Sequence, residues 1–62
     1  MRSWLRDARK SACMSQADVA ELSGVARSAF SMYEIGLRNP SVKVAQKIGK
    51  VLKVKWTRFY TE

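Results

Sequence analysis

The sequence predicts an all-α fold, a compact bundle of four to five short helices in one domain. Apolar residues recur at helical spacing in successive segments, no segment alternates with the period of a strand, and glycines stand where helices are expected to end. The chain has 62 residues, one cysteine and no histidine. An internal disulfide and the usual zinc sites are therefore excluded, and helix packing must hold the domain, 1–62, together.

The first expected helix carries apolar residues on one face and charged residues between them. Its apolar positions are Trp4, Leu5, Ala8 and Ala12, and the intervening residues are Arg6, Asp7, Arg9 and Lys10. A second helix is predicted over about 16–23. Ser15 and Asp18 have the spacing of an N-terminal capping pair, and Gly24 is a typical helix end. Val19, Ala20 and Leu22 are expected on its inner face, and Met14 is placed to form a hydrophobic staple with Val19.

A third helix is predicted over about 26–35, and Gly36 ends it. Its apolar positions are Val25, Ala29, Phe30 and Tyr33, while Arg27, Ser28, Ser31 and Met32 point elsewhere. A fourth helix follows Ser41, a plausible N-cap. Its inner positions are Val42, Ala45, Ile48, Gly49 and Leu52, and its outer ones are Lys43, Lys47 and Lys50. The aromatic tail 54–62 is either a short fifth helix or an extended segment packed on the others.

Charge suggests a class of partner. Twelve Lys and Arg against five Asp and Glu give a formal net charge of +7, which favours association with a polyanion such as nucleic acid. The alternative is a solvated surface, and we assign Lys47, Lys50, Lys53 and Lys55 to long-range attraction only. No apolar run reaches the length of a membrane span or of a signal peptide's hydrophobic region, so we expect a cytoplasmic protein without a membrane partner.

The segment 16–25, with Gln16 at the helix start, small Ala20 at the helix crossing and Gly24 in the turn, resembles the helix-turn-helix domains of the Cro and phage-repressor (XRE-like) type. Phe30 and Tyr33 match the apolar anchors of that family's recognition helix. The loop 38–41 is similar to the family's next loop, so the resemblance covers nearly the whole chain. It implies the lambda-repressor-like bundle and a buried ion pair between Arg9 and Glu34, whose alternative is two unrelated surface charges.

The resemblance also implies how DNA would be read. The third helix would lie in the major groove, with base contacts from Ala26, Arg27, Ser28 and Met32. Phosphate contacts would come from Gln16, Ser31, Arg38, Asn39 and Lys43. Arg27 can hydrogen-bond guanine through two donors, and its alternative role is a phosphate contact. Met32 could instead pack on its own helix.

Three positions depart from the family pattern. Ala26 stands where serine or threonine usually caps the recognition helix, and that cap normally contributes about 1 kcal/mol. Cys13 and Lys53 stand where glycine commonly ends the first and fourth helices. If both residues are left-handed, each adds roughly 1 to 2 kcal/mol of strain; different turns are the alternative.

These features predict a DNA-binding transcriptional regulator, a repressor, that acts as a homodimer at least on DNA. Trp56, Phe59 and Tyr60 either complete the core or form the dimer contact. The alternative function is a protein-interaction module, such as an antitoxin or anti-repressor, that keeps the fold. We expect no enzyme: Cys13 has no base beside it and is interpreted as a small, partly buried hydrophobe. No cofactor, metal or small-molecule ligand is predicted, and the operator and its gene cannot be read from the sequence.

Overall fold

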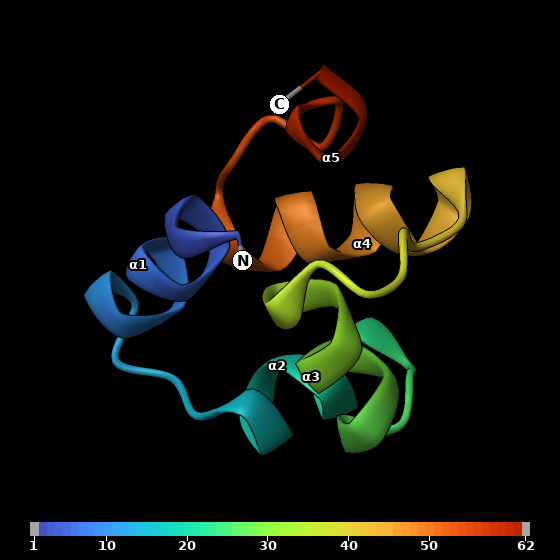
Figure 1. The fold of residues 1–62 in the computed structure, drawn as a ribbon. Coiled ribbons are helices and arrows are strands. Elements are labelled where there is room, and N and C mark those ends of the chain that lie inside the picture. Colours follow the sequence, from blue (N-terminus) through green and yellow to red (C-terminus); the bar gives the residue numbers. More distant parts are fainter. Residues whose placement is uncertain (1, 62) are drawn as a thin grey trace.

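The computed structural model describes residues 2–61 and is all-α, with no strand in that part of the chain. The helices are α1 (Ser3–Ser11), α2 (Gln16–Ser23), α3 (Arg27–Ile35), α4 (Val42–Leu52) and α5 (Arg58–Thr61). α2 packs against both α3 and α4, and α1 contacts α3. In Figure 1, α4 lies between the α2 and α3 pair on one side and α5 on the other. The predicted all-α helix-turn-helix bundle is confirmed.

The helix starts differ in how they are capped. The Ser15 hydroxyl accepts a hydrogen bond from the backbone N–H of Asp18, and the Asp18 carboxylate accepts one from the N–H of Ser15. Ser41 caps α4 by accepting from the N–H of Val44. Ala26 is the N-cap of α3, which begins at Arg27, and its side chain makes no capping hydrogen bond. The capped helix α2 is therefore followed by α3, whose N-terminus has no side-chain cap.

The helix ends are left-handed at four positions. Gly24 and Gly36 follow α2 and α3 with φ of 71° and 91°, values that glycine adopts without a Cβ penalty. Cys13, after α1, and Lys53, after α4, both have φ of 57°. Of the two possibilities that the sequence left open, the left-handed one therefore holds. Each of these residues adds roughly 1 to 2 kcal/mol of strain.

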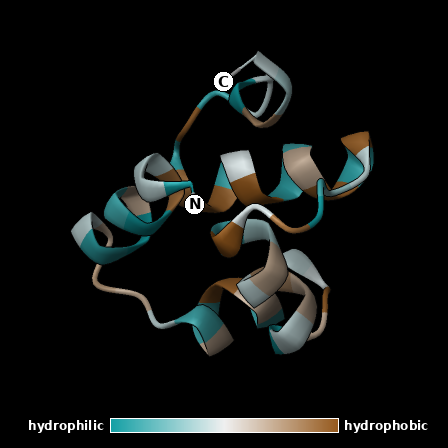
Figure 2. Ribbon diagram, viewed as in Figure 1, coloured by the Kyte–Doolittle hydropathy of each residue, from teal (hydrophilic) through white to brown (hydrophobic). Residues whose placement is uncertain are grey.

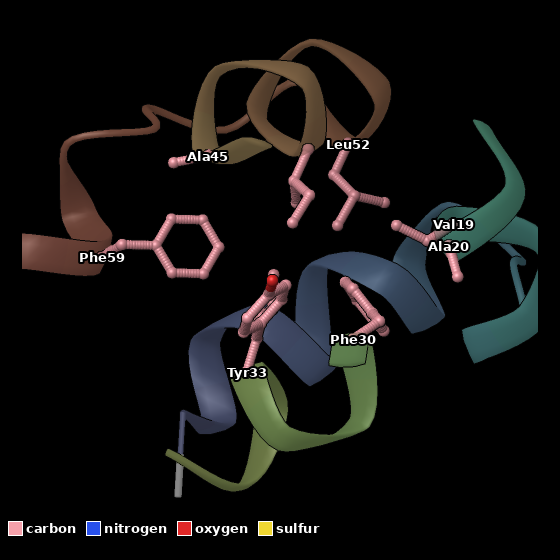
Figure 3. Close-up of a cluster of buried hydrophobic side chains, with 9 residues drawn as sticks. Val19, Ala20, Phe30, Tyr33, Ala45, Leu52 and Phe59 are labelled. Atoms are coloured by element: carbon pink, nitrogen blue, oxygen red, sulfur yellow. The ribbon is translucent and has the colours of Figure 1, made fainter. Parts of the chain in front are cut away.

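The core is a single cluster to which all five helices contribute. Its buried apolar members are Leu5, Val19, Ala20, Phe30, Tyr33, Ala45, Ile48, Leu52 and Phe59. Figure 3 shows the side chains of α4 and α5 facing Tyr33 and Phe30 of α3. Figure 2 shows hydrophobic and hydrophilic segments alternating along α4, as expected for a helix with one buried face. This packing fixes α3 through its inner side and leaves the outer side available.

Some inner-face predictions are wrong. Leu22 is 59% exposed, because the buried face of α2 is formed by Val19 and Ala20 and, one turn later, by Ser23, and Leu22 lies on the adjoining face. Val42 is also exposed, because it is the first residue of α4 and the buried positions of this helix begin at Ala45. Ala12 follows the last residue of α1 and is exposed.

The aromatic tail forms the short helix α5 and completes the core. Phe59 is fully enclosed and meets the Trp4 ring edge to face, with 5.1 Å between ring centroids. Trp56 packs over Gly49, where an added Cβ would lie 3.1 Å from the Cβ of Trp56 and 2.8 Å from the carbonyl oxygen of Val54. Glycine in α4 thus allows the close approach of the segment that leads into α5.

Candidate nucleic-acid interface

The outer side of α3 presents the four side chains that the sequence assigned to base contacts. Ala26, Arg27, Ser28 and Met32 are all exposed. On the opposite side of the same helix, Phe30 and Tyr33 are buried in the core. The helix therefore has one anchored face and one accessible face, which is the arrangement that a helix needs to enter the major groove.

The predicted phosphate-contact residues flank this helix on other elements. Gln16 begins α2 and Ser31 lies on α3, both half-buried, whereas Arg38 and Asn39 are exposed in the loop after α3. Lys43 is exposed in the first turn of α4. The predicted set is thus spread over α2, α3, the following loop and α4, and every member except the half-buried pair is open to solvent.

An ion pair joins the first helix to the end of α3. The Arg9 Nε lies 2.5 Å from Glu34 Oε2, with side-chain exposures of 13% and 3%. Arg9 also donates to the carbonyl oxygen of Met14, at 3.0 Å from its Nη1. Gln16 donates from Nε2 to Glu34 Oε1 at 2.9 Å. Glu34 therefore links α1, α2 and α3, and the participation of Gln16 had no signal in the sequence.

A second polar cluster, at Arg2, was missed by the sequence analysis. The side chain is 95% buried, since only 5% of the residue is exposed. Its Nη1 donates to the carbonyl oxygens of Tyr33 at 2.6 Å and Arg38 at 3.0 Å, and its Nη2 donates to Asn39 Oδ1. An arginine next to the chain start gives no periodic signal, so the sequence pattern could not distinguish it from the surface charges.

The residues named as possible dimer contacts are divided between core and surface. Phe59 is buried and Trp56 is half-buried against the core, so neither ring is fully available to a partner. Tyr60 is 44% exposed, and its hydroxyl donates to the carbonyl oxygen of Pro40 at 2.5 Å. This contact joins α5 to the loop between α3 and α4, beside the residues that Arg2 holds.

No group of three or more Cys, Asp or Glu side chains within residues 2–61 is placed to hold a metal ion. Cys13 is exposed, which corrects its interpretation as a partly buried hydrophobe, because α1 ends before it. Hydrogen bonds from Ser15, first from its backbone N–H, lower the pKa of Asp18. No helix in this part of the chain could cross a membrane.

Comparison with known proteins places these features in context. A family model described as helix-turn-helix matches residues 5–59. The chain is 39% identical over 62 residues to the HTH-type transcriptional regulator YqaF of Bacillus subtilis, spanning all of this chain and 82% of that protein. It is 42% identical over 52 residues to HTH-type transcriptional regulators of two Mycobacterium tuberculosis strains, covering 84% of this chain but 37% of theirs. No solved structure matches it.

Proposed function

The chain belongs to the helix-turn-helix family, and from this premise we propose that it is a transcriptional regulator that binds double-stranded DNA. α3 is the recognition helix in this proposal. The observation that carries it is the contrast between the two faces of α3: Phe30 and Tyr33 are buried, and Arg27 with its neighbours is exposed. A helix anchored in this way can present side chains to base edges without distorting the domain.

Arg27 is the principal base-reading residue of the proposal. It stands in the first turn of α3 and is exposed, and its guanidinium can donate two hydrogen bonds to guanine O6 and N7. Ser28 would add a weakly discriminating hydrogen bond. Ala26 and Met32 would supply apolar contact with thymine methyl groups. These assignments concentrate specificity at one arginine.

Phosphate contacts would supply most of the affinity. Arg38, Asn39 and Lys43 are exposed in the loop and first turn that follow α3, and Gln16 and Ser31 complete the set. The net charge of +7 favours the same partner. Gln16 would share its amide between Glu34 and a phosphate, because a side-chain amide has two N–H donors.

We further propose that the regulator is a repressor and binds as a homodimer. Short recognition helices read limited sequence, so two copies on half-sites one turn apart would raise specificity. The exposed edge of Tyr60 and the half-buried Trp56 are the tail side chains that could meet a second copy, whereas Phe59 belongs to the core. A bound dimer would act by excluding other proteins from its site, in the cytoplasm and without a cofactor.

The experiment is selection of bound duplexes from a random library, with Arg27→Ala alongside. We expect a two-fold-symmetric consensus, and loss of its guanine preference in the variant, at a cost of about 1 to 3 kcal/mol. Lys10→Ala removes one exposed charge from α1 and is the matched control, expected to keep the consensus. In a salt titration, log affinity should fall linearly and steeply with log salt.

The alternative is a protein-interaction module that keeps the fold. Its support is exposed apolar surface outside α3, in particular Leu22 on α2 and Leu37 after α3. If no duplex is enriched at any salt concentration, the DNA-binding proposal fails and this module becomes the first hypothesis. Binding to a partner protein would then be insensitive to Arg27→Ala and sensitive to Leu22→Ser.

A further inference from the structure

The loop 38–40 carries several hydrogen-bond acceptors close to its predicted phosphate contacts. A phosphate oxygen is itself an acceptor and is anionic, so it is attracted by N–H groups and cations and repelled by carbonyl oxygens. A loop that contacts the DNA backbone must therefore face it with donors. The directions in which the acceptor oxygens of this loop point decide whether it can do so.

Three of these acceptors are engaged by donors from opposite ends of the chain. Arg2 Nη1 binds the carbonyl oxygen of Arg38 at 3.0 Å, and Arg2 Nη2 binds Asn39 Oδ1. The Tyr60 hydroxyl binds the carbonyl oxygen of Pro40 at 2.5 Å. In Figure 1, α5 lies on the side of this loop away from α2. Three consecutive residues thus direct an acceptor toward the protein.

The contact with Asn39 has a further consequence for its amide. A guanidinium only donates, so only the oxygen of the Asn39 amide can face Arg2. The Nδ2 group, with two donors, is then directed away from Arg2. Because Asn39 is exposed, those donors are available to an acceptor in solution, and a phosphate oxygen is such a group.

Arg2 is itself held in place by the recognition helix and the core. Its Nη1 donates to the carbonyl oxygen of Tyr33 at 2.6 Å, and its backbone N–H donates to that of Glu34 at 2.8 Å. The guanidinium lies 5.3 Å from the centroid of the Phe59 ring. The loop is thereby tied to the end of α3, so a phosphate bound by the loop would set the position of α3 in the groove.

We propose that Arg2 and Tyr60 are positioning residues for phosphate binding: they turn the acceptors of the loop 38–40 inward, so that Asn39 and Arg38 present donors to the DNA backbone. This inference rests on the proposed DNA-binding function. It gives Tyr60 a role within one copy of the chain, in addition to any contact between copies.

The test measures the affinity of the full chain for its selected duplex after Tyr60→Phe and after Arg2→Met. Loss of one neutral hydrogen bond should weaken binding about fivefold for Tyr60→Phe, and Arg2→Met should weaken it by more than about tenfold. Thr61→Val removes a hydroxyl from the same helix, where it donates to the carbonyl oxygen of Thr57, and Lys10→Met removes an exposed charge. Both controls should stay within about twofold of the wild type.

A double-mutant cycle distinguishes positioning from general destabilisation. Asn39→Ala should weaken binding about fivefold in the wild type and have little further effect beside Arg2→Met, because the amide is then no longer oriented by the guanidinium. The slope of log affinity against log salt should also become shallower by about one for Arg2→Met, because Arg38, the cationic donor of the same loop, then loses its phosphate contact. Variants that merely lower the folded fraction would leave that slope and the Asn39 effect unchanged.

Each outcome bears on one of the two proposals. Additive effects of Asn39→Ala and Arg2→Met, in a wild type that binds its duplex, would overturn the positioning role alone. A wild type that binds no duplex would overturn the DNA-binding function and this inference with it. If Arg2→Met does not fold, as judged by circular dichroism, the duplex affinity of Tyr60→Phe decides the matter, since this variant keeps the aromatic ring at position 60 and the charge of Arg2.

Discussion

The two helices of the helix-turn-helix motif, α2 and α3, end differently from the two helices that flank them in the sequence, α1 and α4, which we call the frame. α2 and α3 are followed by Gly24 and Gly36, for which a left-handed backbone is ordinary. α1 and α4 are followed by Cys13 and Lys53, which adopt the same conformation with a side chain attached. The motif that sets the angle of α3 is therefore free of this strain, and the strain lies in the frame.

The ends of α1 and α4 line one groove. Lys53 lines a groove between the ends of α1 and α4, and Ala12 and Met14, on either side of Cys13, line it as well. Because this groove is formed by α1 and α4, movement there need not alter the turn between α2 and α3. Besides the apolar packing of α2 on α4, the pair of Arg9 and Glu34 joins α1 to α3, so this contact is one place where the two regions depend on each other.

The largest effect is expected when that connection is broken on one side. Glu34→Ala leaves the guanidinium of Arg9 largely buried without its carboxylate, and removes the acceptor of Gln16. We expect a loss of about 3 to 5 kcal/mol in the free energy of unfolding, measured in urea. The double variant Arg9→Met with Glu34→Met should lose much less, since no charge is left unpaired. Equal losses in the two proteins would contradict this account.

This comparison also shows which features the sequence could predict. Helix positions, the Ser15 and Ser41 caps and the ends at Gly24 and Gly36 follow from local chemistry, because each depends on residues within one turn. Leu22 was misplaced because periodicity gives an apolar stripe without its exact centre, and Ser23 takes the inward position. A polar residue at a buried position has no signal of its own.

The Arg2 cluster could not be predicted for a different reason. Its partners Arg38 and Asn39 are more than 30 residues away in sequence, and only the folded chain brings them together. The candidate base-contact face, by contrast, follows from the helical period once α3 is located. Local patterns thus define α3 and its exposed side, while the contacts that fix the neighbouring loop depend on tertiary structure.

A smaller effect, opposite in sign between the two regions, is expected at the left-handed residues. Lys53→Gly and Cys13→Gly should each raise the free energy of unfolding by about 1 kcal/mol, and Gly24→Ala should lower it by about 1 to 2 kcal/mol. The cost at Gly24 is conformational, because the nearest atom to an added Cβ is the Lys47 Nζ, at 3.8 Å. Thermal unfolding of the three variants measures these differences. A Lys53→Gly variant less stable than the wild type would show that the side chain of Lys53 contributes more than its strain costs.

The smallest effects should come from the helix starts of the motif itself. Ser15→Ala should cost about 1 kcal/mol, and Ala26→Ser should gain up to about 1 kcal/mol by capping α3. The stability that the capping box of Ser15 and Asp18 contributes should also depend on pH. The backbone and then the side chain of Ser15 hold the pKa of Asp18 below its ordinary value of 3.8, so its ionised form stabilises the fold.

That stabilisation is fully present above pH 3.8, the ordinary pKa of the Asp18 carboxyl, and is lost as pH falls through its lower folded value. Wild type and Asp18→Asn should therefore differ most near neutral pH and converge at low pH, in urea unfolding followed across that range. Ala26→Ser adds no carboxylate and should keep its gain at every pH. If the difference between wild type and Asp18→Asn instead stayed constant down to pH 2, the capping box would not depend on the charge of Asp18, and both helix starts would be governed by hydrogen bonding alone.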